Sequence, residues 1–265
     1  MLSKSRLKEL CAYRQQKLQD GEGVFIVEGV KMAAEALQWG AVVRCVCATG
    51  EWLAANPEVS GLSGVYEVSP AEMERLTLLK TPSPVWMIVE RKEISEFGVQ
   101  SSELSGYGSH NSELRSPNSE LVLALDRLQD PGNMGTIMRT ADWYGVRRIV
   151  CSRDTVSCFN PKVVQASMGA VFRTRVDYVD LPQWLASCGM TVFGASLHGE
   201  PISHNSEPLP PNSSAVLLIG NEGRGISPEA MAHVTRPVLI PNRGGTAESL
   251  NAAVAAAILM DKLIG

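Results

Sequence analysis

The chain has 265 residues, enough for two ordinary domains or one large one, which excludes a peptide or a disulfide-stapled mini-fold. With 45% hydrophobic and 20% charged residues and a mean hydropathy of +0.00, its composition is that of globular proteins, not of disordered or membrane proteins. Lys and Arg number 24 against 28 Asp and Glu, a net charge of −4, so bulk electrostatics indicate no partner and any anionic ligand must be bound locally.

The cysteines and the N-terminus favour a cytoplasmic location. The six cysteines contain no C-x-x-C pair and no zinc-site spacing, so we expect reduced thiols and no metal site. The first residues lack an apolar run that leads to a small-residue cleavage site, as a secretory signal requires. No stretch approaches the roughly 20 uninterrupted apolar residues of a membrane span. We therefore expect a cytoplasmic protein without membrane attachment.

Residues 1–94 predict a small alternating α/β domain. Residues 3–19 predict one basic amphipathic helix, with five Lys and Arg against a single Glu and with apolar side chains on the opposite face. The basic face fits a solvated surface and an RNA-backbone contact about equally well. The other expected elements are strands at 24–27, 42–48 and 86–90 and helices at 29–39 and 71–79.

Residues 95–120 predict a linker. Eight of these 26 residues are serine and aliphatic side chains are sparse. The segment therefore separates the first domain from a second one at 121–265.

The sequence of the second domain predicts an α/β fold with a parallel sheet. Its apolar runs are continuous, which is typical of strands covered by helices on both faces. Such sheets bind ligands at the carboxyl ends of their strands. The strands are expected at 121–126, 147–152, 191–197, 215–220 and 237–241.

Three unusual segments follow predicted strands of this domain. The first places Asn133 and Arg139 in an N-x-G-x-x-x-R arrangement, the second is the glycine-rich loop 220–225, and the third places Ser249 and Asn251 at the start of an alanine-rich helix. Each segment alone is explained equally well by an ordinary capped helix or a turn. The three segments together, in this order and each after a predicted strand, form a highly specific signature.

With these segments, residues 121–265 resemble the SpoU (TrmH) family of S-adenosylmethionine-dependent RNA ribose 2′-O-methyltransferases, of the SPOUT superfamily. The N-terminal residues, with FIVEGVKMAAEAL at 25–37, resemble the small substrate-binding domain of this family, which is similar to an RNA-binding ribosomal protein. The resemblance implies a trefoil knot in the C-terminal domain and a homodimer assembled across it.

The resemblance also implies site residues. The residues that match the family's catalytic and substrate-positioning groups are Asn133, Arg139, Glu222, Ser249 and Asn251. Those expected around the cofactor S-adenosyl-L-methionine are Leu197, Gly220, Asn221, Ile240, Ser249 and Leu250. One departure from the family pattern is an additional residue, because three residues rather than two stand between Pro241 and Gly245.

Methyl transfer to a ribose hydroxyl needs an in-line hydroxyl and help in removing its proton, and it needs no metal. Guanidinium stays protonated at neutral pH and is a poor base. Our hypothesis is that Arg139 stabilises the developing alkoxide or orients a phosphate that takes up the proton. Glu222 and Asn133 would hold Arg139 and the substrate, while Ser249 and Asn251 would shape the pocket wall.

Other residues are weaker candidates. Trp143 and Tyr144 would either stack on a base or make a dimer or core contact. Histidine 198 fits an ordinary loop position better than a cofactor contact. Four arginines would either line an RNA path or end solvated strands, namely Arg147, Arg148, Arg173 and Arg175.

The leading prediction is a 2′-O-ribose methyltransferase that acts on ribosomal RNA, which the type of N-terminal domain favours. The alternatives are the same chemistry on transfer RNA, and a non-catalytic RNA-binding protein of the same fold.

Overall fold

The computed structural model describes residues 2–91, 120–202 and 208–265. They form two compact units. The first contains Met1–Phe97 together with Cys158–Arg173, and the second contains Gly98–Ser157 together with Thr174–Gly265. The linker expected at 95–120 lies outside the described residues except for Glu120. The domain boundaries expected at 94 and 120 stay a prediction, and they did not include the packing of Cys158–Arg173 with the N-terminal unit.

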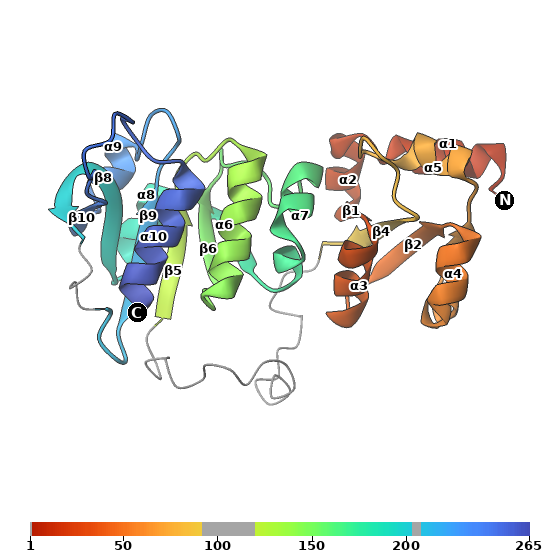
Figure 1. Ribbon diagram of the computed structural model, residues 1–265, viewed down its shortest axis with the longest axis horizontal. Coiled ribbons are helices and arrows are strands. Elements are labelled where there is room, and N and C mark those ends of the chain that lie inside the picture. Colours follow the sequence, from red (N-terminus) through yellow and green to blue (C-terminus); the bar gives the residue numbers. More distant parts are fainter. Residues whose placement is uncertain (1, 92–119, 203–207) are drawn as a thin grey trace. The chain divides into compact units, whose positions relative to one another are not determined.

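The first unit is built on a four-stranded sheet in the order β1-β4-β2-β3 (Figure 1). Strand β4 runs antiparallel to both of its neighbours, while β2 and β3 are parallel. The strands are β1 (Val24–Glu28), β2 (Val43–Ala48), β3 (Val65–Glu67) and β4 (Val85–Glu90). The helices of this unit are α1 (Lys4–Ala12), α2 (Gln16–Glu22), α3 (Val30–Gln38), α4 (Gly50–Ala55), η1 (Pro57–Gly61), α5 (Pro70–Leu76), α7 (Pro161–Ser167) and η5 (Ala170–Phe172).

The single helix expected at 3–19 is wrong, because the structure has two helices with a break after α1. Gln15 is extended, with φ −87° and ψ 119°. The carbonyl group of Tyr13, freed at the break, accepts a 2.7 Å hydrogen bond from the fully buried side chain of Gln19. A buried amide that satisfies a free carbonyl stabilises the break. Leu7 and Leu10 of α1 are buried, so this helix packs with its apolar face inward.

The second unit is built on a six-stranded sheet in the order β10-β8-β9-β5-β6-β7, and all its pairings are parallel. This confirms the α/β class. The knot implied by the family resemblance stays a prediction. The strands are β5 (Glu120–Leu125), β6 (Arg148–Ser152), β7 (Arg175–Val179), β8 (Thr191–Pro201), β9 (Ser214–Ile219) and β10 (Arg236–Leu239). The helices are α6 (Pro131–Trp143), α8 (Leu181–Ser187), α9 (Pro228–Met231) and α10 (Ala252–Ile264).

Helices cover this sheet on both faces. Helices α6 and α10 pack against each other in front of the sheet in Figure 1. On the other face, Val122 and Ala124 of β5 share a buried cluster with Leu181 and Leu185 of α8 and with Ala230 of α9. Strand β5 is therefore buried on both sides, which is why its sequence is a continuous apolar run.

Strand β10 pairs with two separate parts of β8. Its register moves from Gly194 opposite Pro237 to Glu200 opposite Val238. The part of β8 between these pairings, which contains Leu197, is left without ladder partners on β10. Among the described residues, no helix is long and apolar enough to cross a membrane.

Candidate active site

Three polar side chains from distant parts of the sequence form a hydrogen-bonded network in the second unit. The side-chain amide of Asn133 donates to Oε1 of Glu222 at 3.1 Å. The amide of Asn251 donates to Oδ1 of Asn133 at 2.8 Å. The structure thus brings together one residue from each of the three segments that the sequence singled out. We call this set the amide network.

Two helix caps position the amide network. Asp130 caps α6 by accepting from the backbone N–H of Asn133 at 2.7 Å, and its own N–H donates to Glu222 at 3.3 Å. Asn251 caps α10 by accepting from the N–H groups of Ala253 at 2.9 Å and Val254 at 3.3 Å. Because the cap uses the side-chain oxygen of Asn251, the NH2 group is the part of this side chain that faces Asn133. The caps therefore fix which way the amides point.

The loop that carries Glu222 folds back on itself after β9. A Cβ atom at Gly220 would lie 2.2 Å from the backbone of Gly225 and Ile226, so only glycine fits there. Asn221 exchanges backbone hydrogen bonds with Gly225 at 3.0 and 2.9 Å. Its side chain donates to the carbonyl of Arg127 at 2.8 Å, so it ties this loop to the end of β5. The structure thus shows Asn221 as a residue that holds the loop.

The segment before α10 is organised by one asparagine that sequence reasoning did not single out. Oδ1 of Asn242 accepts from the N–H groups of Gly244 at 2.9 Å and Gly245 at 2.8 Å. Its NH2 group donates to the carbonyls of Gly245 at 3.0 Å and Ala247 at 3.3 Å. Gly244 has φ +99°, which glycine adopts without strain. The additional residue of this loop is thus accommodated by side-chain hydrogen bonds, and we call the segment 241–247 the Asn242 loop.

Three of the residues expected around the cofactor lie in or directly after three adjacent strands. Leu197 lies in β8, Gly220 follows β9 and Ile240 follows β10, and these strands are neighbours in the sheet. Leu197 is 62% exposed and Leu250 is 48% exposed. Exposed apolar side chains beside irregular backbone suit a ligand that combines a flat apolar ring with polar groups, as a nucleoside does. Ser249 is also exposed beside Leu250.

Arg139 lies on α6, nearly two turns beyond Asn133, and its side chain is exposed. In the described part of the chain, no hydrogen bond or ion pair joins it to the amide network. The expectation that Glu222 and Asn133 hold Arg139 therefore has no contact in its favour in this structure. An exposed arginine remains available to an anionic ligand.

Arg127, directly after β5, has an unusual backbone conformation that the sequence did not reveal. It has φ +55°, a conformation that non-glycine residues rarely adopt and that concentrates at functional sites. Its N–H donates to Ser152 Oγ at 2.8 Å and its guanidinium lies 3.6 Å from Asp126. A positive φ at a non-glycine residue leaves no periodic pattern in a sequence, so Arg127 was not singled out from the sequence.

Most of the weaker candidates have structural partners. Arg148 and Arg175 both form ion pairs with Asp177, at 3.1 and 2.9 Å. The Tyr144 hydroxyl donates to Asp261 at 3.2 Å, and burial together with this carboxylate raises the pKa of Tyr144. These contacts favour the packing interpretation for Tyr144 and the strand-end interpretation for the two arginines.

The other weaker candidates include Arg173, Trp143 and His198. Arg173 forms an ion pair with Glu35, while Trp143 is 86% exposed and His198 is exposed. Across residues 2–91, 120–202 and 208–265, no group of three His, Cys, Asp or Glu side chains could hold a metal ion.

Comparison with known families matches both parts of the chain. The model of the SpoU rRNA Methylase family matches residues 120–261. The model of the MRM3-like substrate binding domain matches residues 4–86.

Similar proteins match nearly the whole length of the chain. The 23S rRNA (guanosine(2553)-2′-O)-methyltransferase RlmP of Bacillus subtilis is 28% identical and covers 98% of this chain and 100% of its own. A solved structure described as a TrmH-family RNA methyltransferase of Porphyromonas gingivalis is 33% identical, with a TM-score of 0.77 over 99% of this chain and 98% of its own. An AdoMet-bound rRNA methyltransferase of Sinorhizobium meliloti is 29% identical, with a TM-score of 0.77 over 99% and 95%.

Proposed function

This chain belongs to the SpoU rRNA methylase family, and from this premise we propose that it transfers a methyl group from S-adenosyl-L-methionine to a ribose 2′-hydroxyl of ribosomal RNA. The observation that carries the proposal is the amide network, because it joins one residue from each family segment in a single hydrogen-bonded site. Hydrogen bonds that fix polar side chains in one orientation are what a substrate-positioning site requires.

The part of β8 around Leu197 and the ends of β9 and β10 are suited to hold the methyl donor. Leu197 and Leu250 offer exposed apolar surface to an adenine ring, and Gly220 and Ile240 bring backbone close to the same edge of the sheet. When bound, S-adenosyl-L-methionine supplies an electrophilic methyl group on a positively charged sulfur. The Asn242 loop would set how closely the backbone before Leu250 approaches it.

The residues of the chain act by position and charge. The amide of Asn133, held by Glu222 and Asn251, can orient the ribose, because its direction is fixed from two sides. Arg139 is a permanent cation and would stabilise negative charge that develops on the 2′-oxygen, or hold a phosphate that accepts the proton. Ser249 would complete the wall beside Asn251.

Ribosomal RNA is the favoured substrate. Residues 4–86 match a substrate-binding domain, and similar proteins that span the whole chain are named rRNA methyltransferases. The alternative substrate is transfer RNA, and the alternative function is RNA binding without catalysis. The proposed location is the cytoplasm.

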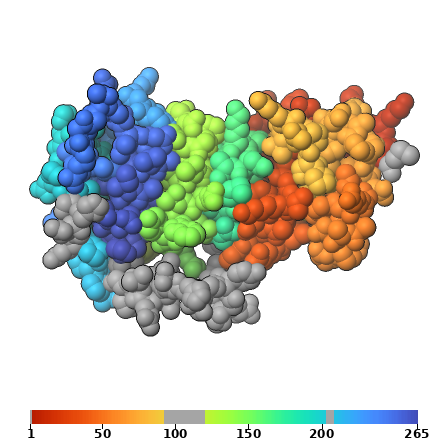
Figure 2. Space-filling model, viewed as in Figure 1, coloured from red at the N-terminus to blue at the C-terminus, as the bar shows by residue number. Residues whose placement is uncertain are grey.

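We further propose that the second unit forms a homodimer. Trp143 on α6 and Val254 on α10 are 86% and 47% exposed, and both helices lie at the surface in Figure 2. An interface that covers these two helices would remove their exposed apolar side chains from water. Light scattering should give twice the chain mass of 28.6 kDa, and the Trp143→Glu variant should give the single mass. A wild-type protein of single mass would contradict the dimer.

The function is tested with labelled S-adenosyl-L-methionine. Purified protein is incubated with unmodified ribosomal RNA and, separately, with total transfer RNA, and the methylated nucleotide is mapped. Label should enter ribosomal RNA only, and Arg139→Ala should reduce the rate by about 100-fold or more. Labelled transfer RNA would favour the alternative substrate. Absence of both label and cofactor binding would favour the non-catalytic alternative.

A further inference from the structure

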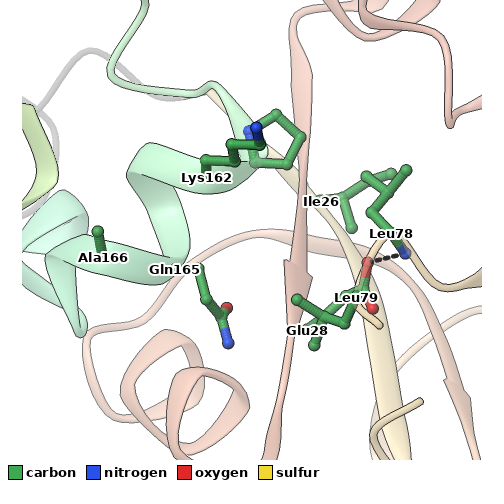
Figure 3. A pocket seen from close by; sticks show the side chains of 8 residues that line it. Ile26, Glu28, Leu78, Leu79, Lys162, Gln165 and Ala166 are labelled. Carbon is green, nitrogen blue, oxygen red and sulfur yellow. Dashed lines mark hydrogen bonds between the residues drawn. The ribbon is translucent and has the colours of Figure 1, made fainter. Parts of the chain in front are cut away.

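The first unit contains a cavity that the proposed methyl transfer does not use. Its volume is about 350 Å³, within the range of small-ligand pockets. Strand β1 and the segment after α5 form one side, with Ile26, Glu28, Leu78 and Leu79, and α7 forms the other side (Figure 3). We call it the Glu28 pocket.

A buried carboxylate lines this otherwise largely apolar pocket. Glu28 is only 5% exposed. Its Oε2 accepts from Thr77 Oγ1 at 2.6 Å, and its Oε1 accepts from the N–H of Leu78 at 2.8 Å. An ionised carboxylate has about four acceptor positions, so these two bonds leave acceptor capacity for a ligand. Burial raises the pKa of Glu28, whereas the bonds from Thr77 and Leu78 favour its charged form.

The opposite wall supplies a cation and an amide. Lys162 and Gln165 extend from α7, as Figure 3 shows. Lys162 is exposed and Gln165 is half-buried, so the cation lies nearer to solvent. Apolar walls, a carboxylate in the interior and a lysine at the opening match the parts of a nucleotide, which has a flat ring, polar ring edges and a phosphate.

The carboxylate discriminates between bases. Guanine presents two adjacent N–H donors on its Watson–Crick edge, which fit a pair of carboxylate oxygens. Adenine, cytosine and uracil each place an acceptor beside their donor, and this acceptor would repel the second oxygen. A carboxylate therefore selects guanine among the four bases.

We propose that the Glu28 pocket binds one unpaired guanine of the RNA substrate, with Glu28 on its donor edge and Lys162 on a neighbouring phosphate. This inference rests on the proposed function for its ligand class. It adds a base-specific contact outside the methyl-transfer site. The unit that carries the pocket would then select the RNA by sequence as well as by charge.

The test measures binding of the full chain to short RNAs. Fluorescein-labelled heptamers UUUGUUU, UUUAUUU, UUUCUUU and UUUUUUU are titrated by fluorescence anisotropy. The guanine heptamer should bind about tenfold more tightly than the other three. Glu28→Gln should remove this preference, so that the four heptamers bind with similar affinity. The matched control is Glu58→Gln, which removes an exposed carboxylate in η1 and should keep the preference.

Glutamine at position 28 should preserve the fold. Its oxygen can accept from the N–H of Leu78, and its NH2 group can donate to the Thr77 hydroxyl, which is both donor and acceptor. As a second variant, Lys162→Met should weaken all four heptamers equally and reduce the salt dependence of binding by about one ion. The proposal would be overturned if the wild-type chain bound the four heptamers with equal affinity, or if the guanine preference persisted in Glu28→Gln.

Methyl transfer to ribosomal RNA, measured on the same preparations, separates the two proposals. If wild type methylates but shows no base preference, the pocket proposal fails alone. If the guanine preference holds but no methyl group is transferred, the proposed function fails and the pocket stands.

Discussion

Two glutamates, one in each unit, accept similar sets of hydrogen bonds but differ in burial. Glu222 accepts from the Asn133 amide and the Asp130 N–H, and Glu28 accepts from the Thr77 hydroxyl and the Leu78 N–H. In both cases one carboxylate joins two segments that are distant in the sequence. Glu222 is exposed, however, whereas Glu28 is 5% exposed.

This difference in burial decides what each carboxylate does for the molecule. Removal of an exposed acceptor lets water replace it, so the fold loses little while the orientation of its partners is lost. Removal of a buried acceptor leaves its little-exposed donors without their protein partner, which costs stability directly. We therefore expect Glu222 to act on function and Glu28 to act on both folding and ligand choice.

The largest effect should come from Glu222→Ala. Loss of the carboxylate frees the Asn133 amide, and we expect the methylation rate to fall by about 100-fold or more, as when a positioned polar group is removed from an active site. The thermal midpoint should change by no more than a few degrees, because the side chain is exposed. Glu229→Ala, an exposed acidic residue of α9, is the control. An unchanged rate would show that the amide network is not the site.

Glu28→Ala should show the opposite pattern. It leaves the Leu78 N–H and the Thr77 hydroxyl without an acceptor, and the free energy of unfolding should fall by about 2 kcal/mol. Affinity for S-adenosyl-L-methionine should stay the same. Urea denaturation and cofactor titration measure the two quantities. Wild-type stability in this variant would contradict the expected contribution of the buried Glu28 carboxylate.

The pH dependence of stability sharpens the contrast. Because the pKa of Glu28 is raised in the folded state, the native protein holds this proton more tightly than the unfolded chain. The contribution of Glu28 to stability is therefore greatest at low pH and falls as pH rises from its ordinary pKa through the raised one. Glu28→Gln should lack this fall when the two proteins are melted at a series of pH values. If the stabilities of the two proteins changed with pH in the same way, a raised pKa of Glu28 would be contradicted.

Asn242→Ala should affect ligand binding and leave the fold nearly unchanged. It removes four hydrogen bonds from the Asn242 loop, all of them at the exposed surface. The backbone next to the proposed cofactor site then becomes less ordered, and affinity for S-adenosyl-L-methionine should fall about tenfold in calorimetry. Gln183→Ala, which removes an exposed side-chain amide from α8, serves as the control. Unchanged affinity would exclude the loop from the cofactor site.

The smallest effect concerns Tyr13, whose hydroxyl donates to Glu22 at 2.6 Å. Burial, followed by this carboxylate, raises the pKa of Tyr13 to about 12. Folding is therefore linked to retention of this proton, and its contribution should decline as pH rises from about 10 to 12. The difference in ultraviolet absorbance between wild type and Tyr13→Phe should show a phenol that titrates near pH 12. A midpoint near 10 would contradict the contact.

The sheet of the second unit could be predicted where its strands are buried on both faces. The continuous apolar runs that become β5 and β9 fit no other element well. Strand β7 was missed, because Arg175 and Asp177 interrupt its apolar residues at the edge of the sheet. The break after α1 was missed as well, since it depends on a buried contact of Gln19 that has no periodicity.

The candidate site was predicted by motif and completed only by geometry. Family segments indicated Asn133, Glu222 and Asn251, but which of them meet depends on residues some 90 to 120 positions apart. The contacts of Asn242 run from a side chain to nearby backbone in a glycine-rich turn, which leaves no distinctive spacing.

Long-range packing in the first unit was equally hidden from the sequence. Phe25 lies with its ring centroid 4.9 Å from that of Phe159 and 5.9 Å from that of Phe172. These contacts join β1 to a segment more than 130 residues away. Because aromatic residues suit any core, their types do not indicate which partner they choose.

Both the oxygen and the nitrogen of the Asn251 side-chain amide make hydrogen bonds, so the site is sensitive to deamidation of this residue. Its oxygen starts α10 and its nitrogen holds Asn133. Deamidation to aspartate would keep an oxygen for the helix, since aspartate caps as well as asparagine. It would also turn a second oxygen toward Oδ1 of Asn133, so that two acceptors face each other. A stored sample could thus keep its melting curve and lose its activity through the gain of a single atomic mass unit.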